Sequence, residues 1–223
     1  MLLPPCSESL RFASSTYTTD MSTPEFQKAR RHLSRRDPVL KQVIRAVGPC
    51  ALKVDADHFA ILARSIISQQ ISTKAAVAIT KRVMEALGRR GLKAKPILEA
   101  DDEKLRGAGL SANKLRCLRD LAEKCQAGDV PLRKLPTLGD EEVIEALLPV
   151  RGIGRWTAEM FLIFSLGRLD VFPVADYGLR SGVQKLFGLS EHPDKAFLAE
   201  LSERWAPYRS VATWYVWRSI SSG

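Results

Sequence analysis

Apolar side chains recur every three to four residues through most of the chain beyond residue 23, a spacing that places them on one face of a helix. This pattern predicts helices over residues 24–47 in two segments, 58–67, 72–87, 97–105, 115–125, 140–148, 155–166, 177–187, 192–205 and 210–220. No stretch alternates apolar and polar residues as a half-buried strand does. The predicted fold class is therefore all-α.

Local signals support several of the predicted helix ends. Pro38 restarts a helix within the first region, since proline is favoured in a first helical turn. Asp57 and Ser111 are predicted N-caps, because their side chains can accept hydrogen bonds from free backbone N–H groups. A helix restarts near Ser72, and Gly88 ends it.

The chain has 223 residues and 45% hydrophobic composition, enough to bury a sizeable core in one domain or two closely packed lobes. Residues 1–22 are rich in Ser, Thr and Pro and have no helical period, which predicts a disordered extension. Met21 is an alternative start, and the apolar patch near residue 2 is too short for a secretory leader. We assign residues 23–223 to a single folded domain.

The charge balance favours a polyanionic partner. Thirty-four Lys and Arg oppose 25 Asp and Glu, a formal net charge of +9. A soluble basic protein without such a partner has the same balance, and the basic residues of 24–47 equally fit a solvated helix face. No apolar run approaches the roughly 20 residues that span a bilayer, so no membrane partner is expected.

The four cysteines, Cys6, Cys50, Cys117 and Cys125, are scattered and have no spacing typical of a zinc or cluster site. Unpaired thiols are typical of a reducing compartment.

The most informative stretch runs from Leu147 to Arg180. Gly152-Ile153-Gly154 predicts a tight turn on two glycines between a helix end and an apolar helix, a place where positive φ or close backbone approach is needed. The free N–H groups at the new helix start favour an anion such as phosphate. About twenty residues later, Asp176 is one carboxylate in an apolar segment, and an N-cap role explains it equally well.

Gly-Ile-Gly-Arg-Trp-Thr-Ala at residues 152–158 and Asp-Tyr at 176–177 closely resemble the helix-hairpin-helix-GPD superfamily of DNA glycosylases. Within it they look most like the alkylpurine enzymes of the 3-methyladenine DNA glycosylase II type. The resemblance extends over about residues 24–220 and implies two helical lobes with a cleft between them. There is no room before Pro24 for the additional β-rich domain of one well-known relative.

The resemblance also implies roles for individual residues. Asp176 would be catalytic, stabilising positive charge on the deoxyribose and orienting water. The residues implied to bind the extruded base are Trp156, Met160, Trp217 and Gln69, whereas Phe164 is assigned to the core. The residues implied to contact DNA are Gln70, Gly152, Ile153, Gly154, Arg155 and Thr157. The main-chain carbonyls implied to hold a monovalent cation, sodium or potassium, are those of Leu148, Val150 and Ile153.

Trp156 occupies the position where relatives that form a Schiff base carry lysine, so hydrolysis without strand cleavage is expected. No further cofactor is expected, and because no cysteine follows Cys125, no iron–sulfur cluster is expected either. The predicted partner is double-stranded DNA containing alkylated bases, bound by a monomer. The expected location is the cytoplasm or nucleoid in a bacterium and the nucleus in a eukaryote.

Two alternatives remain open from the sequence. One is a glycosylase for oxidised, deaminated or mismatched bases on the same fold, which Trp156 disfavours. The other is a DNA-binding module without activity, since Gly-x-Gly hairpins also occur in structural proteins. Asp176 discriminates against the second alternative, because a pure binding module has no use for a carboxylate that faces phosphates.

Overall fold

The computed structural model describes residues 24–221, which form twelve α-helices and two 3₁₀ turns without any β-strand in that range. The helices are α2 Pro24–Arg36, α3 Pro38–Val47, α4 His58–Ser68, α5 Thr73–Leu87, α6 Ala94–Glu99, α7 Asp102–Gly107, α8 Ala112–Ala127, α9 Asp140–Leu147, α10 Arg155–Phe164, α11 Tyr177–Phe187, α12 Lys195–Trp205 and α13 Arg209–Ser221. The all-α prediction is confirmed. The extension predicted over residues 1–22 lies outside the described residues.

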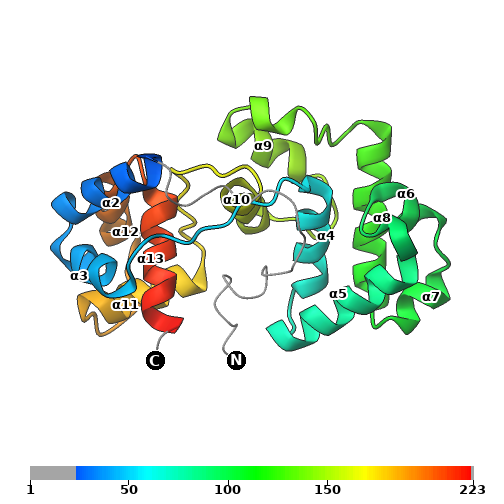
Figure 1. The fold of residues 1–223 in the computed structure, drawn as a ribbon, viewed down its shortest axis with the longest axis horizontal. Helices are drawn as coiled ribbons and strands as arrows, with labels where there is room; N and C mark the ends of the chain where they lie inside the picture. Colours follow the sequence, from blue (N-terminus) through cyan, green and yellow to red (C-terminus); the bar gives the residue numbers. More distant parts are fainter. Residues whose placement is uncertain (1–23, 222–223) are drawn as a thin grey trace.

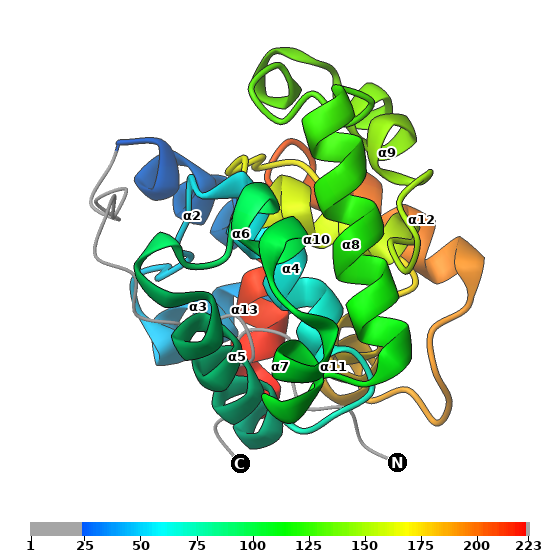
Figure 2. The ribbon, with the colours of Figure 1, turned by 90° about the vertical axis from the view of Figure 1, so that its right-hand side faces the viewer.

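The helices gather into two lobes (Figure 1). One lobe contains α2, α3, α11, α12 and α13, in which α13 packs against α3 and α11. The other contains α4 to α8, with α8 packed against both α4 and α6. The first and last segments of the chain therefore build one lobe together, and the middle of the chain builds the other. Figure 2 shows the second lobe in front, with α8 running along it.

Helix α10 lies between the two lobes (Figure 1) and contacts α4 and α9. Its residues from Thr157 to Phe164 are all buried, as are nine of the eleven residues of α4. A helix that is apolar on every side needs neighbours on every side, which explains the central place of α10. None of the helices in residues 24–221 is long and apolar enough to cross a membrane.

The predicted N-caps are present. Asp57 accepts the N–H of Ala60 at the start of α4, and Ser111 accepts an N–H group at the start of α8. Ser72, where only a helix restart was predicted, caps α5 in the same way. Asp37 caps α3 and is fully buried. Its second oxygen is also satisfied, because it accepts the indole N–H of Trp205 at 2.9 Å. Caps therefore fix where these helices begin, and Asp37 additionally ties α3 to α12.

Three predicted helix boundaries were wrong. The single helix predicted over 97–105 is two short helices, α6 and α7, because Asp101 caps a new helix by accepting the N–H groups of Glu103 and Lys104. The helix predicted from residue 192 begins at Lys195, where Asp194 provides the cap. The helix predicted to reach residue 166 ends at Phe164.

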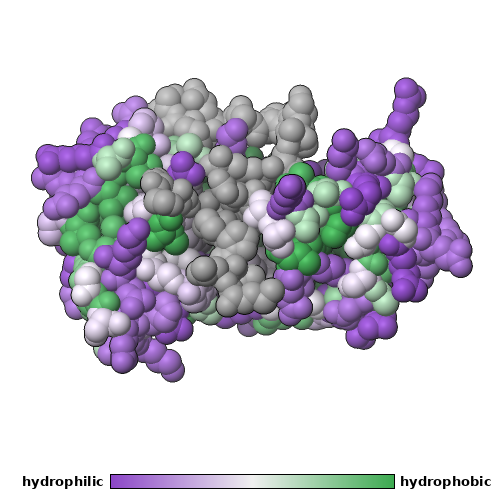
Figure 3. Space-filling model, turned by 90° about the horizontal axis from the view of Figure 1, so that it is seen from below, coloured by the Kyte–Doolittle hydropathy of each residue, from purple (hydrophilic) through white to green (hydrophobic). Residues whose placement is uncertain are grey.

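Seen from below, both lobes present apolar surface interspersed with hydrophilic residues (Figure 3). The large hydrophobic side chains exposed in the described residues are Val77, Met84, Leu148, Trp156, Val174 and Tyr177. Four of these six lie in the stretch from Leu147 to Arg180 that the sequence singled out. Exposed apolar side chains so concentrated beside one carboxylate indicate a binding surface.

Candidate active site

Asp176 lies at the start of α11 and is only 4% exposed. Its Oδ1 accepts the backbone N–H of Leu179 at 2.6 Å, which confirms the N-cap role. A buried carboxylate needs partners for both of its oxygens, and a cap supplies only one. The other partners therefore decide how this group is oriented.

Two tryptophans supply those partners. The indole Nε1 of Trp156 in α10 donates to Oδ2 of Asp176 at 2.9 Å, and Nε1 of Trp217 in α13 donates to Oδ1 at 2.8 Å. An indole N–H can only donate, so each carboxylate oxygen of Asp176 accepts one hydrogen bond from a tryptophan. Three helices thus converge on one carboxylate and fix its orientation.

The two indoles differ in exposure. Trp156 is 36% exposed, whereas Trp217 is fully buried and stacks on Phe164 with ring centroids 5.8 Å apart. Met160 is buried as well. Neither Met160 nor Trp217 presents a face to solvent in this structure, so the base contacts predicted for them remain predictions. The indole N–H of Trp217 donates to the Asp176 carboxylate. Phe164 lies in the core, as expected.

Val174 and Tyr177 flank Asp176 in the chain and are both exposed. The Tyr177 ring contacts the His192 ring edge-to-face, with centroids 5.6 Å apart. Trp156, Val174 and Tyr177 are therefore three exposed side chains that are bonded to the buried carboxylate or lie within two positions of it in the chain. Sequence reasoning did not assign a site role to Val174 or Tyr177, although two large apolar residues next to a capping Asp were a usable signal.

A second buried carboxylate, Glu159, lies one turn beyond Trp156 in α10, and burial raises its pKa above the usual range. The charge of Asp176 also acts to raise the pKa of Glu159. Arg155 acts to lower the pKa of Glu159, because its Nε lies 3.4 Å from Oε1 of Glu159. The two terminal nitrogens of the same guanidinium donate to the two carboxylate oxygens of Glu141 at 3.0 and 2.5 Å. The guanidinium predicted to contact DNA is therefore already held by two carboxylates. The sequence analysis did not identify Glu159 as a site residue, because a single Glu in a helix is usually on the solvent-exposed face.

The glycine turn, residues 148–154, connects α9 to α10. Gly152 has φ +81°, and a Cβ built on it would lie 2.9 Å from the Sγ of Cys117. Gly154 has φ −103°, and a Cβ there would meet nothing within 4 Å. The prediction that both glycines are required by the turn is right for Gly152 and wrong for Gly154, which has an ordinary backbone conformation and open space.

Gly154 is the N-cap of α10 and has no side chain to accept hydrogen bonds from the first helical turn. Backbone N–H groups at such a helix start favour an anion. Ile153 and Thr157 are buried, so the DNA contacts predicted for these two residues are expected through their backbone atoms and not through their side chains. The turn thus combines a positive helix end with a surface that Gly154 leaves unobstructed.

The glutamine turn, residues 69–71, connects α4 to α5. Gln70 is exposed and has φ +59°, an unfavourable conformation for a non-glycine residue. The Nε2 of Gln69 donates to the carbonyl oxygen of Gly152 at 2.7 Å. The structure therefore joins two predicted DNA-contacting turns that lie about 80 residues apart in the chain.

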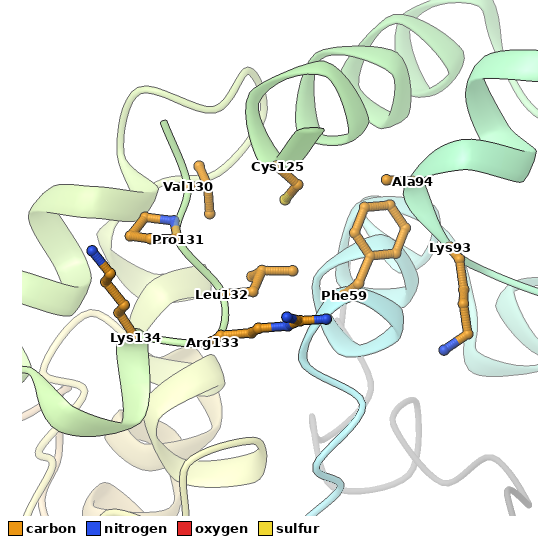
Figure 4. A pocket seen from close by; sticks show the side chains of 9 residues that line it. All are labelled: Phe59, Lys93, Ala94, Cys125, Val130, Pro131, Leu132, Arg133 and Lys134. Carbon is orange, nitrogen blue, oxygen red and sulfur yellow. The ribbon is translucent and has the colours of Figure 1, made fainter. Parts of the chain in front are cut away.

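A separate hollow of about 500 Å³ lies between α4, α6, α8 and the following loop (Figure 4). The residues that line it are Phe59, Lys93, Ala94, Cys125, Val130, Pro131, Leu132, Arg133 and Lys134. None of the predicted site residues is among them. Within residues 24–221, no three His, Cys, Asp or Glu side chains gather to hold a metal ion.

Comparison with known proteins identifies the family. Residues 63–207 match the family described as HhH-GPD superfamily base excision DNA repair protein. DNA-3-methyladenine glycosylase 1 of Schizosaccharomyces pombe is 38% identical over 198 residues, covering 86% of each chain. The solved structure of the 3-methyladenine DNA glycosylase from this yeast in complex with abasic DNA has a TM-score of 0.77 at 36% identity, covering 87% of this chain and 97% of that one.

A bacterial structure gives the same result. The DNA-3-methyladenine glycosidase of Bacillus halodurans has a TM-score of 0.77 at 36% identity and covers 92% of both chains. The family match contains the glycine turn, α10 and Asp176 at the N-cap of α11, and it ends before α13, which carries Trp217. Sequence, fold and site therefore agree that this chain belongs to the HhH-GPD superfamily of base excision DNA repair proteins.

Proposed function

We propose that the protein is a monofunctional DNA glycosylase for alkylated purines of the 3-methyladenine and 7-methylguanine type. It extrudes the damaged base from double-stranded DNA and hydrolyses the N-glycosidic bond, leaving an abasic site for base excision repair. The observation that carries the proposal is the buried carboxylate of Asp176 under the indole N–H groups of Trp156 and Trp217. The names of the relatives supply the substrate class.

The chemistry follows from that carboxylate. As the N-glycosidic bond breaks, positive charge develops on the deoxyribose, and the bonding electrons leave with the base. Asp176 stabilises this charge and orients a water molecule, whose oxygen bonds to the sugar carbon and whose proton passes to the carboxylate or to solvent. An alkylated purine is cationic and departs as a neutral base, so no general acid is required.

Base recognition is assigned to the exposed ring of Trp156. A cationic base stacked on an indole face gains roughly 0.5 to 2 kcal/mol from the ring electrons. Extrusion costs a few kcal/mol and is easiest for a damaged base. We assign to Gln70 the filling of the vacated space in the duplex, because its side chain is exposed at the tip of the glutamine turn.

We propose that the glycine turn grips a DNA phosphate with help from a monovalent cation. None of the described backbone N–H groups donates to the carbonyls of Leu148 or Ile153, and the Val150 carbonyl accepts only the N–H of Ile153, at 3.0 Å. Three carbonyl oxygens with free lone pairs fit sodium or potassium. The ion would supply positive charge to the phosphate.

The direct test of the proposed function is incubation with randomly methylated genomic DNA, followed by mass spectrometry of the released bases. Release of 3-methyladenine and 7-methylguanine is expected. Release of oxidised or deaminated bases alone would favour another glycosylase class, and binding without release would leave a DNA-binding module.

We propose that the active form is a monomer, which size-exclusion chromatography would check. It would act where the DNA is, in the bacterial cytoplasm or nucleoid or the eukaryotic nucleus.

The glycine turn gives a prediction that separates its two glycines. Gly152→Ala should lower the melting temperature and weaken DNA binding, because alanine is strained at φ +81° and its Cβ meets Cys117. Gly154→Ala should leave the melting temperature near wild type and weaken binding to damaged and undamaged duplex alike, because only an approaching phosphate meets the new methyl group. Thermal melts and fluorescence anisotropy at two salt concentrations measure both effects.

Wild-type DNA affinity in a folded Gly154→Ala protein would show that the glycine turn is not part of the DNA interface. Wild-type stability of Gly152→Ala would instead show that the turn tolerates a side chain.

The reaction should end at an intact abasic strand. No lysine occurs between residues 147 and 180, and Trp156 occupies the position of the Schiff-base amine. Treatment with borohydride during the reaction should therefore trap no protein–DNA adduct, as judged by denaturing gel electrophoresis. A trapped adduct on the wild-type protein would mean that another lysine reaches the sugar.

A further inference from the structure

Helix α8 directs one face toward both turns that are assigned to DNA. Lys114, Cys117 and Asp120 recur every three residues on that face. Lys114 Nζ donates to the carbonyl oxygen of Ile67 at 2.6 Å, in the last turn of α4 just before the glutamine turn. A lysine at a helix C-terminus satisfies a free carbonyl and opposes the negative helix end. Lys114 therefore anchors the glutamine turn to α8.

Asp120 anchors the glycine turn to the same helix. Its Oδ2 accepts the backbone N–H of Arg151 at 2.7 Å, and its Oδ1 accepts a hydrogen bond from Lys124 at 2.5 Å. Burial acts to raise the pKa of Asp120, but the contacts with Lys124 and Arg151 outweigh it and hold the pKa below the usual value. Asp120 is therefore a charged acceptor for one N–H group of the turn.

Two further contacts close the arrangement. Cys117, between the two anchors on α8, lies directly under Gly152. Gln69 joins the two turns themselves by donating to the Gly152 carbonyl. The two turns and the face of α8 thus form a closed set of contacts, although the turns are about 80 residues apart in the chain.

We propose that α8 is a brace that fixes the glutamine turn relative to the glycine turn, with Lys114 and Asp120 as positioning residues for base extrusion. The proposal rests on the proposed glycosylase function. To insert Gln70 into a duplex, the protein must hold the phosphate backbone at the glycine turn while the side chain enters. If the turns move independently, the binding energy gained at one turn is not available to unstack the base at the other.

The brace acts before the chemical step. Asp176 and its two indole partners make their contacts through α10, α11 and α13, none of which carries Lys114 or Asp120. Loss of the brace should therefore slow excision of a base that must be extruded and spare a base that is already unpaired. A defect in folding or chemistry would slow both.

The experiment uses two duplexes with the same 7-methylguanine, one with the lesion paired to cytosine and one with it in a single-nucleotide bulge. Lys114→Met and Asp120→Ala should each lower the single-turnover rate about tenfold on the paired lesion and less than about threefold on the bulge. Asp120→Asn keeps an acceptor oxygen for Arg151 and should stay near wild type. Lys95→Met removes an exposed cation from α6 and controls for lost charge.

The ratio of the two rates is insensitive to any unfolded fraction, because one preparation acts on both duplexes. A 2-aminopurine beside the lesion should report slower extrusion in Lys114→Met and Asp120→Ala. Equal losses on both duplexes, or no loss on either, would overturn the brace. A wild-type protein that releases no alkylated base from either duplex would instead overturn the proposed function, and the brace with it.

Discussion

Asp176→Asn should lower the single-turnover rate of base release by about a hundredfold or more, while affinity for lesion-containing duplex changes far less. The carboxylate acts on positive charge that develops only in the transition state, and loss of one preorganised electrostatic group typically costs 10²- to 10³-fold in rate, about 2.7 to 4 kcal/mol. In the ground state the same charge is repelled by phosphates, so binding does not depend on it. Quenched-flow excision and anisotropy titration measure the two quantities.

The substitution also disturbs local contacts, and this needs a control. The asparagine oxygen can still accept the N–H of Leu179, but its amide group would face an indole N–H, donor against donor. Asp194→Asn is the matched control, because Asp194 caps α12 through the N–H of Phe197 and contacts neither indole. It should match the wild-type rate. If Asp176→Asn keeps more than about a tenth of the wild-type rate, a loss below ~1.4 kcal/mol, Asp176 is not the key group.

The helices could be predicted because their signals are local. Amphipathic spacing and capping residues such as Asp57 and Ser111 act within a few positions of the chain. The errors arose where two local signals competed, as at Asp101, where a helical pattern continues across a residue that starts a new helix. The two-lobed arrangement came from the family resemblance, because periodicity does not say which helices become neighbours.

The site was predicted only in part, for the same reason. The motif indicated Asp176 and Trp156 together, but the indole contacts join residues 20 and 41 positions apart. The pairing of Gln69 with Gly152 spans 83 positions. Such contacts depend on tertiary packing, which also decides that Trp217 is buried and that Glu159 lies inside. Sequence alone does not determine which face of an indole remains exposed.

Trp156 combines two roles that substitutions can separate. Its side chain is 36% exposed and is proposed to stack on a cationic base, and its N–H donates to Asp176. Trp156→Phe keeps an aromatic ring and removes the donor, so excision of cationic and neutral bases should fall by similar factors. Trp156→Ala removes both the ring and the donor. The difference between the two variants therefore isolates the contribution of the ring.

Trp156→Ala should reduce excision of 3-methyladenine and 7-methylguanine about tenfold or more beyond the loss in Trp156→Phe. A ring face contributes roughly 0.5 to 2 kcal/mol to a cation, and removing a packed aromatic side chain adds to that loss. Hypoxanthine is neutral and should lose less, if the wild-type protein releases it at a measurable rate. Single-turnover rates on duplexes that differ only in the lesion give the comparison. Equal losses for cationic and neutral bases in Trp156→Ala would mean that the ring contributes shape, and that other residues determine the selectivity for alkylated purines.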